Sequence, residues 1–209
     1  MRRWLVVAAA LVAFGAFNAW RHREIAHGPG VLADDVPRQT EPADAQVVRR
    51  GDFELQPLAD FSLEARVLSR HDYHLDAGSA LSPTDLALGW GRMSDTAVLA
   101  ALDISQSARF YSYRWQGEPP IPAPEIVRSS ANMHLIPADA GVARALARVR
   151  TGEVIELAGH LVEARRADGW HWRSSLTRED SGAGACELVL VDSIGPAADA
   201  VEAGAAASP

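Results

Sequence analysis

The chain has 209 residues, a formal net charge of −7 and 48% hydrophobic residues, which is sufficient for one domain with its own hydrophobic core. The net acidity argues against nucleic acid as the main partner. The single cysteine, Cys186, excludes an internal disulfide, so the core alone must stabilise the fold.

A charged start and an apolar run open the chain. Two arginines precede an apolar stretch from Trp4 to Trp20, which as a helix at ~1.5 Å per residue would be about 25 Å long, close to the minimum for crossing a bilayer. Tryptophan at each end is typical of helix ends at a membrane surface. Only Gly15 with Ala13 offers the small residues that a signal peptidase requires. We therefore expect residues 1–23 to be an anchor in the bacterial inner membrane, with the remaining chain in the periplasm or outside the cell; a cleaved signal peptide is the alternative.

Two further segments lack the periodicity of a helix or a strand. Residues 24–57 are polar and contain several prolines and glycines, which predicts a flexible linker. Residues 196–209 are mostly alanine with small polar residues, which predicts a disordered tail. The extracytoplasmic domain is therefore expected at residues 58–195.

The first half of this domain combines strand and helix patterns. Apolar and polar residues alternate over 61–67, which predicts a half-buried strand. A serine followed by proline at the first helical position predicts two short helices over 83–102. Alternation returns over 109–115 in a strand with an aromatic face, and residues 132–136 predict a short strand.

The second half predicts one helix followed by strands. Asp139 can cap a helix whose buried stripe lies within 142–149. Residues 153–164 predict the clearest strand, the turn Asp168-Gly169 returns the chain, and 186–194 predict the last strand.

Three strands, a helix and then further strands follow one another in this domain. That order resembles the OB-fold, a small Greek-key barrel with a helix between its third and fourth strands. We therefore expect a β-rich α+β domain, an OB-like barrel or sandwich with inserted helices. An ordinary α+β sandwich is the alternative.

Two stretches resemble a known group of proteins. The chain resembles a family of membrane-anchored bacterial proteins with an extracytoplasmic domain in two stretches of its sequence. The first is Ser-Ala-Asn-Met-His-Leu-Ile-Pro over 130–137, and the second is the segment 172–187 with its run Ser-Ser-Leu-Thr-Arg-Glu-Asp-Ser-Gly. The resemblance covers most of the domain. It implies no activity and assigns no site residues.

The long polar loop between Ser174 and Cys186 is the best candidate for a binding site, because long loops in compact domains are often functional. Two glycines in it permit a turn whose N–H groups could hold an anion. The alternative is a loop held by its own Ser and Asp hydrogen bonds. The candidate ligand-binding residues are Ser174, Ser175, Arg178 and Asp180 in the loop, with Trp170, Trp172 and His134 nearby.

Cys186 is the candidate nucleophile of an alternative, catalytic interpretation. His134 or His171 would serve as its base, as in a cysteine-dependent hydrolase or transpeptidase acting on envelope material. However, Cys186 shares a strand face with Leu188 and Leu190, which predicts a thiol in the core, where it would be unreactive.

No metal or cofactor site is expected. His71 and His74 are three residues apart at a predicted strand end and so face opposite ways. Seven arginines gather between 144 and 178, and they could face anionic envelope material. The sequence thus favours a membrane-tethered, non-catalytic binding or assembly module of the bacterial envelope, with an envelope protein or an anionic ligand as partner.

Overall fold

The structure is a computed structural model, and it describes residues 4, 7, 11, 12, 15, 23–180, 182 and 184–198. Most of the expected anchor, and all of the expected tail beyond residue 198, therefore lie outside the described residues. None of the helices in the described part is long and apolar enough to cross a membrane.

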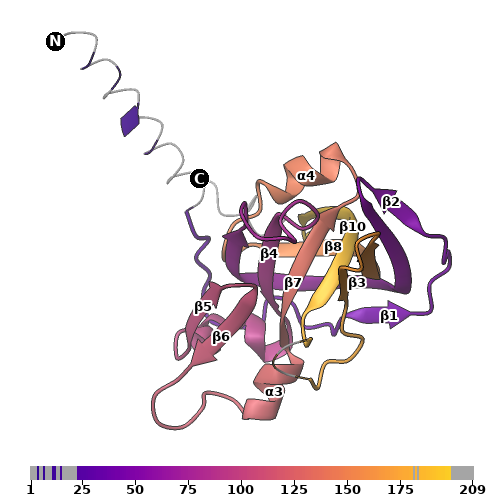
Figure 1. The fold of residues 1–209 in the computed structure, drawn as a ribbon. Helices are drawn as coiled ribbons and strands as arrows, with labels where there is room; N and C mark the ends of the chain where they lie inside the picture. Colours follow the sequence, from indigo (N-terminus) through magenta and orange to yellow (C-terminus); the bar gives the residue numbers. More distant parts are fainter. Residues whose placement is uncertain are drawn as a thin grey trace.

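Five strands form a closed ring, drawn in Figure 1. Their order is β3-β4-β7-β10-β8, and β8 pairs again with β3. The β7–β10 pair is parallel and the other four pairs are antiparallel. The bounds are Phe53–Asp72 (β3), Thr84–Gly89 (β4), Ser130–Pro137 (β7), Val154–Arg166 (β8) and Glu187–Pro196 (β10). Every strand of the ring thus has a partner on both sides.

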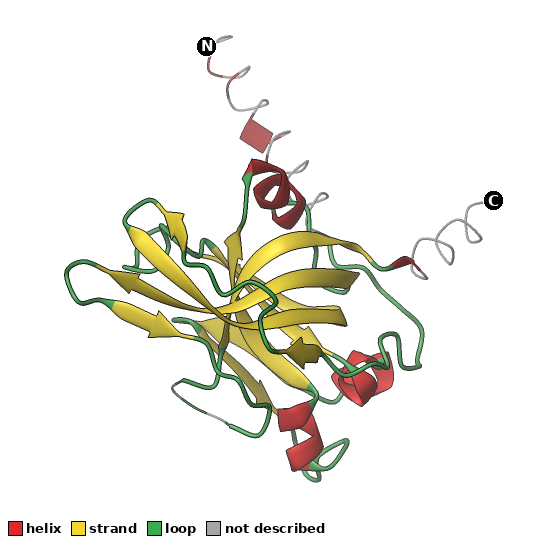
Figure 2. Cartoon of the chain, turned by 90° about the vertical axis from the view of Figure 1, so that its right-hand side faces the viewer, coloured by secondary structure: helices red, strands yellow, loops and turns green. Residues whose placement is uncertain are grey.

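The remaining elements surround the ring. Short strands extend it: β1 (Arg38–Thr40) and β2 (Val48–Arg50) pair with β3, and β9 (His171–Arg173) pairs with β8. The insertion between β4 and β7 contains η1 (Gly91–Ser94), α2 (Thr96–Leu99), the hairpin β5 (Asp103–Ser107) and β6 (Phe110–Arg114), and α3 (Ala123–Arg128). Between β7 and β8 lies α4 (Ala140–Leu146), and Figures 1 and 2 place α4 and α3 at opposite ends of the molecule.

Alternate residues of the ring strands point inward and form the main core. From α4, Val142 and Leu146 pack against this core and cover one end of the ring. Asp139 caps the helix by accepting hydrogen bonds from two backbone N–H groups, as its position in the sequence predicts. Large side chains in this core include Phe61, Leu86, Leu88, Trp90, Met133, Leu135, Leu157 and Leu161.

The segment 24–57 differs from the flexible linker that its composition predicts. It contains β1, β2 and the start of β3, so the hydrogen-bonded sheet begins before residue 58. The N–H of Ile25 donates to the carbonyl of Thr151, and the backbone of Ala33, 1% exposed, is bonded to Ser94 Oγ. The carbonyl of Ile25 occupies the place that a Cβ would take at Gly152, which explains glycine there. Hydrogen bonds to residues distant in sequence help to hold this segment in place. Contacts of this kind produce no periodic pattern in the sequence, so composition alone suggested a flexible linker.

The helix expected from residue 83 is a strand, β4. All six of its residues are buried, so neither alternation nor helical periodicity marks it. The helices that follow are only four residues long each. The aromatic strand over 109–115 is confirmed as β6, but its partner β5 was not expected. At the other end of the chain, Ala197 is buried and bonds to Val154, so the part of the expected tail that is described packs on the domain.

Candidate functional site

The hairpin β5–β6 lies on the outer face of the ring, where it covers a second, smaller core. Buried residues of this core come from the outer faces of the ring strands and from the insertion itself, and the hairpin adds partly buried Ile104, Tyr111 and Tyr113. The fully or nearly fully buried members are Leu68, Ala87, Met93, Ile121 and Ile126. The insertion is therefore fixed to the ring by apolar packing.

The turn of this hairpin is unusual. Ala108 and Arg109 have φ of 49° and 70°, the left-handed region that a two-residue hairpin turn requires and that side chains other than glycine rarely adopt. The N–H of Arg109 donates to Tyr73 Oη at 2.8 Å, and its carbonyl accepts from Asn132 Nδ2 at 3.0 Å. These contacts from two other elements hold the strained turn in place.

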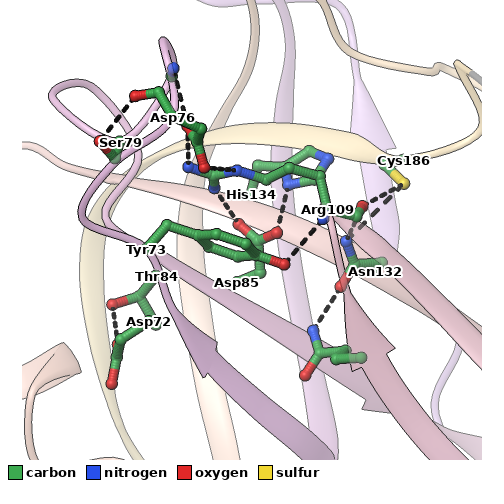
Figure 3. A network of polar contacts seen from close by, with 12 residues as sticks. Asp72, Tyr73, Asp76, Ser79, Thr84, Asp85, Arg109, Asn132, His134 and Cys186 are labelled. Carbon is green, nitrogen blue, oxygen red and sulfur yellow. Dashed lines mark hydrogen bonds and ion pairs between the residues drawn. The ribbon is translucent and has the colours of Figure 1, made fainter.

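The side chain of Arg109 is the centre of the polar network shown in Figure 3. Its Nε and Nη2 donate to the two oxygens of Asp76 at 3.0 and 2.9 Å, and Nη1 donates to Asp85 Oδ1 at 2.7 Å. The guanidinium also lies 3.8 Å from the centre of the Tyr73 ring. Hydrogen bonds from Arg109 lower the pKa of Asp76. The ion pair between Arg109 and Asp85 therefore connects the hairpin turn to β4.

His134 belongs to this network, on the other side of Asp85. The register pairs the two residues across β4 and β7, and Nδ1 of His134 lies 2.9 Å from Asp85 Oδ2, although the two atoms are not aligned for a hydrogen bond. Trp172 covers the imidazole with ring centroids 4.5 Å apart. His134 is only 2% exposed, so its ring is part of the protein interior.

Cys186 lies beside Asn132. Its Sγ is 3.8 Å from Asn132 Nδ2 and donates to the carbonyl of Arg109 at 3.9 Å. Burial raises the pKa of the thiol to about 11, so it is protonated at neutral pH. Among the described residues no contact joins the thiol to His134 or to the exposed His171. The thiol is half-buried and lines a cavity, whereas its strand phase predicts full burial.

Hydrogen bonds within the loop 174–187 hold much of it. Ser174 Oγ accepts from the N–H of Leu188 at 3.1 Å, and Ser175 Oγ donates to Asp180 Oδ2 at 2.6 Å. Ser174 and Ser175 are buried, so they stabilise the loop and are not free to contact a ligand.

Arg178 links the loop to strands β10 and β1. Its Nη1 donates to Glu187 Oε1 at 2.6 Å, and its Nη2 donates to Gln39 Oε1 at 3.0 Å. Glu187 is 1% exposed, and burial raises its pKa to about 7 even though Arg178 opposes the shift. The guanidinium therefore compensates a carboxylate that would otherwise be buried without a positive partner.

A cavity of about 330 Å³ lies between the loop and strand β6. One wall is β6 from Phe110 to Tyr113, and the other includes Arg178, Asp180 and Cys186. Residues 130–132 of β7 and Val127 of α3 also line it. A volume of a few hundred Å³ with aromatic and polar walls is typical of small-ligand pockets.

The structure brings together only part of the residue set that the sequence suggests. Arg178 and Asp180 line the cavity, but Trp170, Trp172 and His134 do not. Trp170 packs edge-on against Phe53 instead, at 5.3 Å between centroids. Sequence reasoning missed the contributions of β6 and Asn132, although the aromatic alternation of β6 marks it as unusual for an exposed hairpin.

Within the described part of the chain, no group of three or more His, Cys, Asp or Glu side chains is arranged to hold a metal ion. His71 packs against Tyr73, at 4.5 Å between ring centroids. No family model, curated protein or solved structure matches this chain.

Proposed function

We propose that this protein is a non-catalytic binding module of the bacterial envelope, whose ligand occupies the cavity between β6 and the loop 174–187. The observation that carries the proposal is the composition of that cavity. Phe110 and Tyr111 supply aromatic surface, while Asn132, Arg178 and Asp180 supply polar groups within the same 330 Å³. Such a combination provides burial and orientation for a ligand.

The geometry supports binding over cysteine chemistry. A nucleophilic cysteine needs a lowered pKa and a neighbouring base, whereas burial raises the pKa of Cys186 and its contacts are an amide and a carbonyl. The candidate base, His134, is enclosed by Asp85 and Trp172. Both groups therefore serve packing and hydrogen bonding.

We infer that the ring is an OB-like barrel. Its strand order, its single parallel pair β7–β10 and the position of α4 between β7 and β8 support this interpretation. The insertion between β4 and β7, which contains one wall of the cavity, departs from the simple form.

Attachment to the inner membrane through residues 1–23 is also part of the proposal. Its support is the apolar stretch from Trp4 to Trp20 in the sequence. Carbonate extraction of bacterial membranes tests it: the full chain should remain in the membrane pellet at its full mass. A soluble product that starts near Ala16 would contradict it.

A ligand titration tests the cavity. Benzamides, benzylamines and benzoates are screened by NMR against the purified full chain, and at least one class should shift resonances of residues 110–113 in a saturable manner. Phe110→Ala should weaken that binding at least about tenfold, because its side chain, 48% exposed, forms part of the wall. Leu75→Ala is the matched control, since Leu75 is fully exposed outside the cavity. Equal binding of a ligand by both variants would refute the site, and so would the absence of binding by every one of these classes and by peptides.

A further inference from the structure

Strand β6 has a free edge. The hairpin β5–β6 is a separate two-stranded sheet, so β6 has a strand partner on one side only. Its turn has two residues, which makes the flanking pair Ser107–Phe110 a hydrogen-bonded pair. Ser105–Ser112 is then the next such pair, and the residues between them point their backbone groups the other way. The N–H and C=O groups of Tyr111 and Tyr113 therefore face away from β5.

The cavity runs along this free edge. Four consecutive residues, Phe110 to Tyr113, line it. Side chains alternate between the two faces of a strand, so a space that contacts all four must lie beside the strand and not over one face. Described residues of the loop form the facing wall, and β7 with α3 closes the third side. These loop residues are Thr177, Arg178, Asp180, Gly182, Ala185, Cys186 and Glu187. The result is a groove in which one wall carries backbone donors and acceptors that no strand in the described part of the chain pairs.

We propose that this groove binds an extended peptide segment of a partner protein, which adds to β6 as a further strand. This inference rests on the proposed function and names its ligand class. Backbone groups of the peptide would satisfy the open N–H and C=O groups of Tyr111 and Tyr113, the mode of recognition known as β-augmentation. At about 3.4 Å per residue, four residues of β6 accommodate a peptide core of about four residues.

The charges and the exposed apolar residues define the peptide further. Arg178 is engaged by its ion pair with Glu187 and its hydrogen bond to Gln39, whereas the Asp180 carboxylate is exposed on the facing wall and accepts a hydrogen bond from Ser175 Oγ. Phe110 on β6, and Leu176 beside Thr177 of the facing wall, are 48% and 38% exposed. The groove therefore fits an extended segment with apolar residues and at least one lysine or arginine.

Selection from a random heptapeptide library displayed on phage, against the purified full chain, tests the proposal. Enriched peptides should be apolar and basic. N-methylation of their backbone should weaken binding at every second position only, because alternate N–H groups face β6. Sensitivity at all positions or at none would overturn the strand arrangement.

Two variants at position 113 separate the contribution of the free-edge backbone N–H to peptide binding from the contribution of the tyrosine side chain. Tyr113→Pro removes the ring and the free-edge N–H, while Tyr113→Ala removes the ring alone; neither removes a bond to β5. Peptide binding should fall at least about tenfold more in Tyr113→Pro than in Tyr113→Ala. Equal binding by the two variants would overturn the proposal.

Other outcomes of these experiments would point to a different occupant of the groove. If benzamides or benzylamines bind in the cavity but no peptide is enriched, the peptide inference fails while the proposed function stands; if neither binds, both fail. Light scattering of the full chain without peptide tests a second copy of the chain as occupant. A dimer that Tyr113→Pro dissociates would overturn the assignment to a partner peptide.

Discussion

The ring and the hairpin β5–β6 differ in how they use their strand edges. Each ring strand is paired on both sides around an apolar core, whereas β6 is paired on one side and borders a groove. The hairpin is fixed to the ring by a small apolar cluster and by Arg109, whose charge interacts with two aspartates. Closed edges prevent unwanted pairing, and an open edge allows recognition. The main apolar core and the proposed recognition site thus lie in different parts of one domain.

Leu135→Ala would affect the ring most. Leu135 is fully buried in the main core, so truncation leaves a cavity and should lower the free energy of unfolding by about 2–5 kcal/mol. Urea denaturation followed by far-UV circular dichroism measures the change. Leu75→Ala serves as the control and should change the unfolding free energy by less than about 0.5 kcal/mol, because Leu75 is fully exposed. A comparable loss in the two variants would show that the ring is not the main source of stability.

Arg109→Met should break the link between hairpin and ring. The variant leaves Asp85 buried without its guanidinium partner, at a cost of about 3 kcal/mol in unfolding free energy. Resonances of β5 and β6 should shift more than those of the ring. Arg49→Met is the matched control, since Arg49 pairs with Glu54 in solvent and such pairs contribute about 0–1 kcal/mol. A loss below about 1 kcal/mol for Arg109→Met would contradict a structural role for the network.

Glu187 should give the domain a distinct pH dependence. Its folded pKa of about 7 lies above its ordinary value of 4.5, so the folded state holds a proton that the unfolded state releases. The unfolding free energy should therefore fall as the pH rises from about 4.5 to 7, by on the order of 2 kcal/mol. Glu187→Gln should remove this decline. An identical pH profile in the variant would show that the carboxyl is ionised throughout.

Arg178→Ala and Asp180→Ala should differ in their effects on stability and on peptide binding, although both residues line the groove. Arg178 compensates the buried Glu187, so its loss should destabilise the fold by about 2 kcal/mol. Asp180 is exposed, and its loss should change stability by less than about 1 kcal/mol while weakening the binding of basic peptides. Thermal unfolding and peptide titration of both variants separate the two effects. Equal destabilisation would show that the hydrogen bond from Ser175 to Asp180 contributes as much to stability as the ion pair of Arg178 with Glu187.

The strands with alternation or an apolar face were predictable from sequence. Residues 61–67 lie in β3, the strand predicted over 153–164 is β8 from Val154 onward, and Asp139 caps α4, because local patterns specify these elements. The buried strand β4 was not predictable, since it lacks alternation. The contacts of residues 24–57 were not predictable either, because several of them, such as those of His27 and Leu32, are with residues more than fifty positions away in sequence.

The candidate site was predictable only in part, because the sequence reveals local features but not contacts between distant segments. The composition of the loop identified Arg178 and Asp180, and both line the cavity. The opposite wall depends on a tertiary approach of β6 to this loop, which no local pattern encodes. Likewise, the sequence predicts Asp85 in the first turn of a helix that Ser82 caps, but pairing of β4 with β7 places Asp85 between Arg109 and His134.

Amide hydrogen exchange measured by NMR tests the open edge of β6 most directly. In the free protein, the amides of Tyr111 and Tyr113 should exchange quickly, while those of Phe110 and Ser112, which bond to β5, should be protected. Addition of an enriched basic heptapeptide should slow exchange at Tyr111 and Tyr113 and leave Phe110 and Ser112 unchanged. Protection of Tyr111 and Tyr113 without peptide, or no change on its addition, would contradict the account.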